Sequence, residues 1–327
     1  MEYRNLGATD LRVSAVGFGG WPMGGTQVVD GYGGAAEDEV IAAVQRALDL
    51  GITCFDTAYA YGLGYGEELM AKALGPRRKD VVLVTKVGIY FDEATGKWRR
   101  DSRYATVVES VEGSLRRLKT ECIDLYLVHW PDTETPFEEP MRAMSDLIAA
   151  GKIRYAGVSN FSAAQIAECL KTTRLAANQV GLNMFDRRWE PELLPYCQRQ
   201  GIGIMAYGPL AHGLLTGTFT RQTTFDAKDW RAGGTIFGLP LFKGENFQKN
   251  LAVVERLKAL AAERDKTLPQ LAIAWVLRHE VVTVALVGAR KPSEIEENVG
   301  AADWRLTAED LAAVDEILKD AAGTTPA

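Results

Sequence analysis

The sequence lacks an apolar run of about 18 residues, which is the length that a membrane-spanning helix needs. It also has little basic charge, since 37 lysines and arginines stand against 43 aspartates and glutamates, for a formal net charge of −6. Nucleic-acid binding requires a basic face, so neither a membrane nor a nucleic acid is expected as a partner. The short basic runs at 77–79 and 99–100 are interpreted as solvated loops.

Cysteine and histidine are scarce as well. The four cysteines lie far apart without a C-x-x-C pair, and no apolar signal-peptide core follows Met1, so a reduced cytoplasmic protein is expected. The three histidines, His129, His212 and His279, stand in separate segments with no H-E-x-x-H motif. No metal site is therefore expected, and His212 and His279 are interpreted as solvated side chains.

Three common enzyme signatures are missing. The glycine-rich segment 17–22 has Pro22 where the third glycine of a Rossmann fingerprint belongs. None of the eleven tyrosines has a lysine four residues later, which excludes the Tyr-x-x-x-Lys pair of short-chain dehydrogenases. There is no G-x-S-x-G motif, so serine hydrolase chemistry is unsupported.

What the sequence does contain is an alternation of short β-branched runs with segments of helical period, over all 327 residues. This alternation predicts a parallel sheet wrapped in helices. No linker interrupts it, so we expect an α/β protein with one (β/α)8 TIM barrel domain, 1–327. The expected strands are 14–19, 53–56, 81–86, 125–129, 155–159, 177–180, 203–207 and 284–287. The expected barrel helices are 37–50, 66–74, 105–118, 136–150, 163–172, 190–200, 247–264 and 292–301.

Further segments are expected outside this repeat. An N-terminal β-hairpin around 5–11 is expected to plug the bottom of the barrel, and extra C-terminal helices are expected at 268–278 and 308–318. The longest irregular segment, 210–246, follows the seventh strand, and an insertion at 88–102 follows the third. Both would lie on the C-terminal face, where barrel enzymes build their active sites.

Four polar residues stand at or just beyond the ends of separate predicted strands: Asp56, Tyr61, Lys86 and His129. An ionisable group at the end of a buried strand either faces a pocket or carries a large desolvation cost. A lysine ammonium lowers the pKa of a neighbouring tyrosine, and a carboxylate keeps the lysine charged, so Tyr61 is expected to act as a proton donor. His129 is expected to donate to a carbonyl oxygen.

These residues lie in segments that resemble the aldo-keto reductase superfamily. Residues 56–62 match D-T-A-x-x-Y-G, 124–130 match D-L-Y-x-x-H-W, and 151–161 match G-K-I-R-x-x-G-V-S-N-F. The resemblance covers essentially the whole chain and is greatest to bacterial reductases of the general-stress and inositol-operon type. It implies NAD(P)H-dependent reduction of an aldehyde or ketone, or the reverse oxidation, by the catalytic tetrad Asp56, Tyr61, Lys86 and His129.

The resemblance also implies where the cofactor binds. The amide and hydroxyl groups of Ser159, Asn160 and Gln179 would hold the nicotinamide, and Tyr207 would stack on its ring. The substrate pocket would include Trp21, Tyr59 and Trp130. The full set expected to bind the cofactor is Trp21, Asp56, Ser159, Asn160, Gln179, Tyr207, Gly208, Pro209, Leu210, Gly213, Leu214, Gly288, Arg290, Glu294, Glu297 and Asn298.

Two alternatives stay open at this point. NADP(H) is favoured because Arg290 suits a 2′-phosphate, but Glu294 replaces the usual Arg or Gln and would repel that phosphate, so NAD(H) is the alternative cofactor. The same motifs also occur in cofactor-sensing subunits such as potassium-channel beta subunits, so a regulatory binding role is the alternative function. The partner is expected to be a small carbonyl or alcohol whose identity the sequence does not reveal.

Overall fold

A closed barrel of eight parallel strands lies at the centre of the structure, which is a computed structural model describing residues 1–24, 36–92, 94–227 and 229–325. Five of the strands, β4, β5, β8, β10 and β12, are buried along their whole length, as expected for strands covered on both faces. The expected (β/α)8 TIM barrel is confirmed. Around the barrel the strand order is β10-β11-β12-β3-β4-β5-β8-β9. The bounds are β3 (Val16–Gly19), β4 (Cys54–Asp56), β5 (Val82–Val87), β8 (Ile123–Val128), β9 (Ile153–Ser159), β10 (Ala177–Gly181), β11 (Gly203–Tyr207) and β12 (Val282–Val287).

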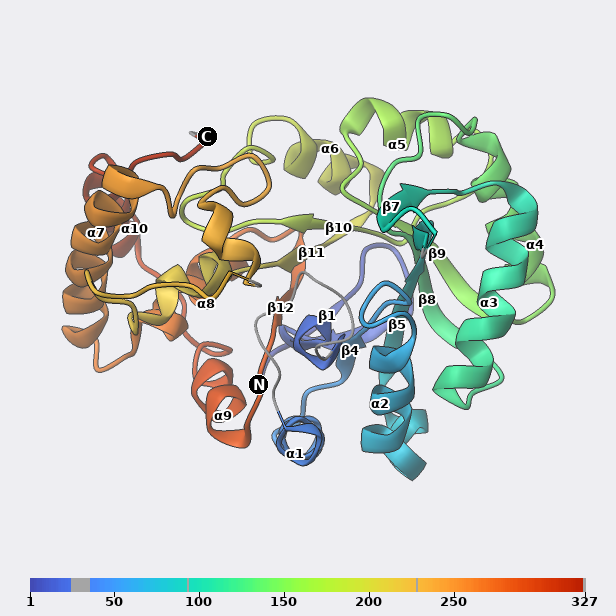
Figure 1. Ribbon diagram of the computed structural model, residues 1–327, viewed down its shortest axis with the longest axis horizontal. Coiled ribbons are helices and arrows are strands. Elements are labelled where there is room, and N and C mark those ends of the chain that lie inside the picture. Colours follow the sequence, from blue (N-terminus) through green and yellow to red (C-terminus); the bar gives the residue numbers. More distant parts are fainter. Residues whose placement is uncertain (25–35, 93, 228, 326–327) are drawn as a thin grey trace.

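Helices surround the barrel, and α7 and α10 lie together on the side away from α3 and α4 (Figure 1). Each barrel helix follows its strand. The bounds of the strands and helices agree with those expected from the sequence to within three residues, because the apolar periodicity of the sequence indicates where each kind of element lies. None of the described helices is long and apolar enough to cross a membrane. The bounds are α1 (Glu37–Asp49), α2 (Tyr65–Leu74), α3 (Tyr104–Leu118), α4 (Glu138–Ala149), α5 (Ala163–Cys169), α6 (Leu193–Gln200), α7 (Gly244–Ala262), α8 (Leu268–Leu277), α9 (Pro292–Val299) and α10 (Ala308–Leu318).

The expected N-terminal hairpin closes the bottom of the barrel. Strands β1 (Tyr3–Asn5) and β2 (Arg12–Ser14) pair antiparallel, and Leu6 and Leu11 are buried among apolar side chains of the barrel interior. Ser14 therefore belongs to the hairpin, and the first barrel strand begins at Val16 instead of residue 14. With the bottom filled, the open end of the barrel is the end at which the strands finish.

Two segments extend beyond the strand ends on that side. The insertion after β5 forms a second hairpin, β6 (Ile89–Asp92) with β7 (Lys97–Arg100). The long segment after β11 contains two short 3-10 helices, η3 (Ala211–Thr216) and η4 (Trp230–Gly233), and ends where α7 begins. Positions 93 and 228 in these segments lie outside the described residues.

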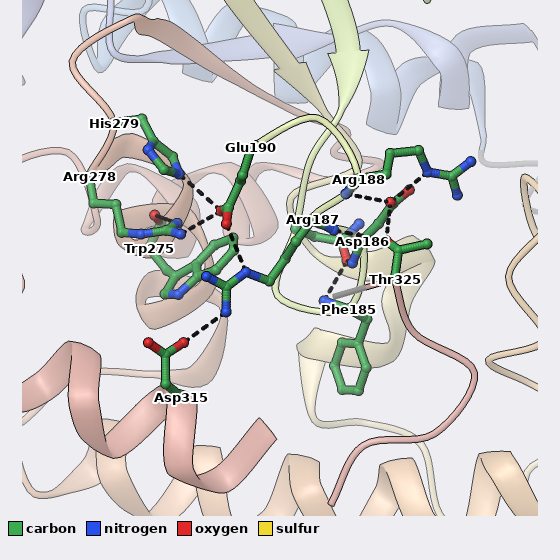
Figure 2. A network of polar contacts seen from close by, with 11 residues as sticks. Phe185, Asp186, Arg187, Arg188, Glu190, Trp275, Arg278, His279, Asp315 and Thr325 are labelled. Atoms are coloured by element: carbon green, nitrogen blue, oxygen red, sulfur yellow. Dashed lines mark hydrogen bonds and ion pairs between the residues drawn. The ribbon is translucent and has the colours of Figure 1, made fainter. Parts of the chain in front are cut away.

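A buried carboxylate, Glu190, ties the segment after β10 to the end of α8 (Figure 2). It pairs with Arg187, Arg278 and His279, and the His279 Nε2 atom lies 3.0 Å from its carboxylate. Burial alone would raise the pKa of Glu190, but His279 and the two guanidinium groups outweigh burial and lower it to about 2. His279 is thus paired with Glu190 and remains only 27% exposed, so its interpretation as a solvated side chain holds only in part.

The variant Glu190→Gln is expected to lower the free energy of unfolding by about 2 kcal/mol at pH 7, with allowance for solvent screening. Because the pKa of Glu190 is lower in the folded chain than its ordinary value of 4.5, this stabilisation is complete above pH 4.5 and disappears as the pH falls toward 2. Urea unfolding of both proteins between pH 3 and 7 measures the difference. The exposed neighbour Glu192 provides the control, Glu192→Gln, which should change stability by less than about 0.5 kcal/mol. A pH-independent difference for Glu190→Gln would contradict the prediction.

Candidate active site

A cavity of about 940 Å³ lies at the C-terminal ends of the barrel strands. Residues that lie in, end or directly follow seven different strands line it, and such residues at the C-terminal ends of the strands are typical of barrel active sites. The long segment after β11 and the β6–β7 hairpin also contribute to its wall, as the sequence led us to expect. The strand-end residues are Gly19, Asp56, His129, Ser159, Tyr207 and Val287, and Gln179 lies two residues before the end of β10.

The Lys86 ammonium is the centre of a polar cluster that lies beneath the cavity wall, where Asp56 and Tyr61 line the cavity and Lys86 is fully buried behind them. Its Nζ atom donates to the Asp56 carboxylate at 2.8 Å, to the Thr57 carbonyl oxygen at 2.8 Å and to the Tyr61 hydroxyl at 3.0 Å. Asp56 ends β4 and Lys86 lies on the adjacent strand β5, so the barrel itself places the ion pair. An ammonium has three N–H groups, and all of them are directed at a partner.

Tyr61 reaches this cluster from the turn that follows β4. Its ring lies edge-on to the His129 ring with centroids 5.8 Å apart, and it stacks on Trp21 with centroids 6.2 Å apart. Gly62 allows the turn, since its φ is +69° and a Cβ atom there would lie 2.4 Å from the Gly24 carbonyl oxygen. The structure therefore brings Asp56, Tyr61, Lys86 and His129 together at one end of the cavity.

Burial determines the charge state of this cluster. It raises the pKa of Tyr61 well above its ordinary value, with a further contribution from the Asp56 carboxylate, and it lowers the pKa of Lys86 against the attraction of Asp56. Burial and the Lys86 charge hold the pKa of His129 well below its usual range. The expected lowering of the Tyr61 pKa by Lys86 is therefore wrong for this state of the site, because desolvation of the phenolate outweighs the single favourable charge. Tyr61 and His129 are both neutral hydrogen-bond donors at neutral pH.

A chain of amide and hydroxyl groups supports Asp56 from the neighbouring strands. Gln179 Nε2 donates to the Asp56 carboxylate at 2.8 Å, and the Ser159 hydroxyl donates to the main-chain carbonyl oxygen of Gln179 at 2.8 Å. Asn160 Nδ2 donates to the Ser159 hydroxyl at 3.0 Å, and its Oδ1 atom accepts from the Tyr207 hydroxyl at 2.9 Å. The side chains that the resemblance assigns to the nicotinamide thus form one connected network with the catalytic cluster.

The other end of the same cavity lies at the start of α9. Gly288, Glu297 and Asn298 line it, together with Arg290 and Glu294, which form an ion pair of 3.1 Å. Glu294 also accepts from the Arg290 backbone N–H at 2.7 Å. A long dinucleotide fits this arrangement, because one cavity joins the tetrad to a basic helix N-terminus where phosphates bind readily.

Two of the residues expected to contact the cofactor or the substrate do not reach the cavity. Tyr59 packs against Tyr90 with ring centroids 5.7 Å apart, beneath the Arg117 guanidinium, and Leu214 is fully buried in the core. In contrast, Trp21 and Trp130 line the cavity, as do the remaining residues expected at the cofactor: Gly208, Pro209, Leu210 and Gly213.

Sequence reasoning missed the aromatic cover of the cavity. Phe237 lies over the site, with its ring centroid 5.7 Å from Tyr207 and 6.0 Å from Trp130. His212 lies beside it with centroids 5.5 Å apart and is only 8% exposed, so its interpretation as a solvated side chain is wrong. No periodicity marks residues in such a segment, and only its length indicated a role.

Phe237 is held from outside the cavity. Its φ is +47°, and its carbonyl oxygen accepts from Arg188 Nη2 at 3.0 Å. Figure 2 shows Arg188 directed at Asp186, which also accepts from the hydroxyl of Thr325 near the C-terminus. The segment after β10 therefore fastens both the cavity cover and the C-terminal region.

The basic runs also differ from expectation. Arg78 pairs with Asp124 at 2.9 Å, and Arg99 and Arg100 lie on strand β7 and line the cavity. The expected solvent exposure therefore holds for Arg77, Lys79, Arg99 and Arg100, but Arg78 is half-buried and the second run lies on a strand instead of a loop. Among the described residues, no group of three histidine, cysteine or acidic side chains has the arrangement of a metal site.

The Aldo/keto reductase family matches residues 15–319 of the chain. An aldo-keto reductase of Bacillus subtilis is 39% identical over 323 residues, covering 98% of this chain and 94% of the relative. An NADH-specific methylglyoxal reductase of Escherichia coli is 33% identical over 325 residues, covering 95% of this chain and 97% of the relative. A probable voltage-gated potassium channel subunit beta of Arabidopsis thaliana is 35% identical over 323 residues, covering 93% and 92%.

Solved structures agree with these relatives. A glycerol dehydrogenase from Gluconobacter oxydans superimposes with a TM-score of 0.89 at 38% identity, covering 99% of this chain and 97% of that one. An aldo/keto reductase from Klebsiella pneumoniae, in complex with NADP and acetate, gives a TM-score of 0.73 at 30% identity, covering 97% and 95%. This chain therefore belongs to the Aldo/keto reductase family and is an oxidoreductase that reduces carbonyl groups with NAD(P)H.

Proposed function

We propose that residues 1–327 act as one barrel domain that reduces an aldehyde or ketone, with Tyr61 as the proton donor. The observation that carries this proposal is the contact of the buried Lys86 Nζ with the Tyr61 hydroxyl and the Asp56 carboxylate, two groups whose side chains line a large cavity. A phenol fixed beside a buried ammonium is suited to protonating an oxygen that gains negative charge.

The proton transfer follows from this geometry. The nicotinamide cofactor, when bound, supplies the hydride to the carbonyl carbon. Tyr61 then gives its proton to the carbonyl oxygen, and the Lys86 ammonium stabilises the phenolate that forms. The Asp56 carboxylate keeps Lys86 protonated despite its burial, and neutral His129 donates a hydrogen bond to the same oxygen.

The cofactor would lie along the cavity, from the tetrad to α9. Ser159, Asn160 and Gln179 would hold the nicotinamide amide, and Tyr207 would stack on the ring. Arg290 would bind the adenosine end together with Glu297 and Asn298. Phe237 packs against Tyr207 and would exclude water from the reacting atoms once the site is filled.

NADP(H) is the proposed cofactor, and the pairing of Arg290 with Glu294 is expected to limit the preference for it over NAD(H). The variant Glu294→Gln frees the guanidinium for a 2′-phosphate and should raise the ratio of kcat/KM for NADPH to that for NADH by about tenfold. Arg290→Ala should lower the same ratio. Steady-state kinetics with both cofactors measure it, and an unchanged ratio in both variants would show that the preference is set elsewhere.

A regulatory binding subunit is the alternative, since one relative is a probable potassium channel subunit beta. A panel of sugar-derived, aromatic and dicarbonyl substrates tests both roles by the consumption of NADPH or NADH. An enzyme should turn over at least one class many times per active site. Cofactor binding with no turnover on any class would favour the sensor role.

A further inference from the structure

The β6–β7 hairpin presents one of its faces to the cavity. In its antiparallel register Ile89 lies opposite Arg100, and Phe91 lies opposite Trp98. Paired residues and those two apart along a strand share a face, so Ile89, Trp98 and Arg100 lie together, and all three line the cavity. Trp98 is 37% exposed, and its ring packs edge-on against Phe91 with centroids 5.2 Å apart.

Arg100 is fixed beside the catalytic cluster. Its guanidinium carbon lies 5.4 Å from the centroid of the Trp130 ring, and its Nη1 atom donates to the Pro131 carbonyl oxygen at 2.9 Å. Trp130 directly follows His129 in the chain, and both line the cavity. A guanidinium carries five N–H groups, so most of the donors of Arg100 remain for a ligand.

Arg100 differs from the other cations at the catalytic end of the cavity in having no acidic partner among the described residues. Within the part of the chain that the structure describes, no carboxylate lies within ion-pair distance of Arg100, whereas its neighbour Arg99 pairs with Asp101 at 2.8 Å. Lys291 lies at the distant α9 end. The remaining cations that line the cavity or lie beneath it are paired, namely Lys86 with Asp56, Arg231 with Asp229 and Arg290 with Glu294.

We propose that Arg100 binds an anionic group, a carboxylate or a phosphate, at the far end of the carbonyl substrate. The planar guanidinium matches the oxygens of both groups, and its stacking on Trp130 holds it in place before the substrate arrives. Trp98 provides an apolar wall for the carbon atoms between the carbonyl and the anion. This inference rests on the proposed function, since it assumes that the carbonyl is reduced beside Tyr61 and His129.

Matched pairs of substrates test the charge. The wild-type protein should reduce 4-carboxybenzaldehyde with a kcat/KM about tenfold above that for its uncharged methyl ester, and the difference should lie mainly in KM. Glyceraldehyde 3-phosphate against glyceraldehyde forms the phosphate pair, and the pair with the larger ratio identifies the natural anion. Arg100 is exposed to solvent on one side, so salt should screen its charge. The preference for the anionic substrate should therefore shrink when the salt concentration rises from 0.05 to 0.5 M, because the Debye length falls from about 14 to about 4 Å.

Variants of the β6–β7 hairpin test whether Arg100 causes the preference for the anionic substrate. Arg100→Gln should remove the preference for the anion and leave kcat/KM for the ester within about twofold, while Arg100→Lys should keep part of the preference. The control Arg99→Gln changes the same strand but removes a cation that already has a partner, so the preference should persist.

Two results would overturn the inference. One is equal kcat/KM for the charged and uncharged members of both pairs, and the other is a preference that survives Arg100→Gln or is lost only in Arg99→Gln. Turnover of the uncharged esters in either case would leave the proposed carbonyl reduction intact. Absence of turnover on every substrate would contradict the proposed function itself.

Discussion

Replacing Tyr61 with phenylalanine is expected to lower kcat by about 10²- to 10⁴-fold, which is the usual contribution of a general acid. The variant removes one oxygen atom and keeps the ring that stacks on Trp21 and lies edge-on to His129. Lys86 keeps its contacts with Asp56 and with the Thr57 carbonyl oxygen, so the cavity should retain its shape. Cofactor affinity, measured by quenching of tryptophan fluorescence, should therefore change by less than about threefold.

Tyr65→Phe is the matched control, because Tyr65 lies at the start of the next helix and its hydroxyl donates to Glu37 at the surface. This control should leave kcat unchanged. A Tyr61→Phe protein with normal turnover would reject the assignment of the proton donor. A loss of cofactor binding equal to the loss of kcat would instead indicate that the hydroxyl acts mainly by maintaining the site.

The barrel could be predicted because two periodicities mark it. Fully apolar strand runs alternate with amphipathic helices, and each tetrad residue lies at a fixed place relative to a strand end. Lys86 lies on β5 and Asp56 ends β4, so their contact follows once the strands are known to be neighbours. Tyr61 follows from the motif and not from periodicity, since it lies in a turn.

The failures have a physical cause in common. Tyr59 was expected in the pocket from the resemblance, but it lies in a turn and packs against Tyr90 instead. Phe237 was missed because its position depends on Arg188, 49 residues away. Such contacts depend on loop conformation, which the local sequence pattern does not specify.

The pKa of Tyr61 shows the same limit in energetic terms. A pairwise argument from Lys86 gives a lowered pKa, but the burial that accompanies the contact acts in the opposite direction and is larger. The charges in this site therefore depend on how completely the barrel encloses them. This conclusion leads to a prediction about the ion pair itself.

Lys86→Met is expected to abolish most turnover and also to destabilise the fold by about 3–5 kcal/mol, because it leaves the buried Asp56 carboxylate without its cation. Asp56→Asn alone should destabilise less, since the asparagine oxygen can still accept from Lys86 and burial already favours the neutral amine. The double variant should recover much of the stability lost in Lys86→Met, because it places no unpaired charge in the barrel.

Urea unfolding of the four proteins at pH 7 forms a double-mutant cycle, and kcat is measured on the same samples. Turnover should stay low in the double variant even where stability returns, since the phenolate of Tyr61 would lack the ammonium that stabilises it. Recovery of stability without turnover separates the catalytic role of Lys86 from its structural one. The contrary outcome is a double variant whose loss of stability equals the sum of the losses in the two single variants. The Asp56–Lys86 contact would then contribute no coupling energy, and the proposal that Asp56 supports Lys86 during proton transfer would be rejected.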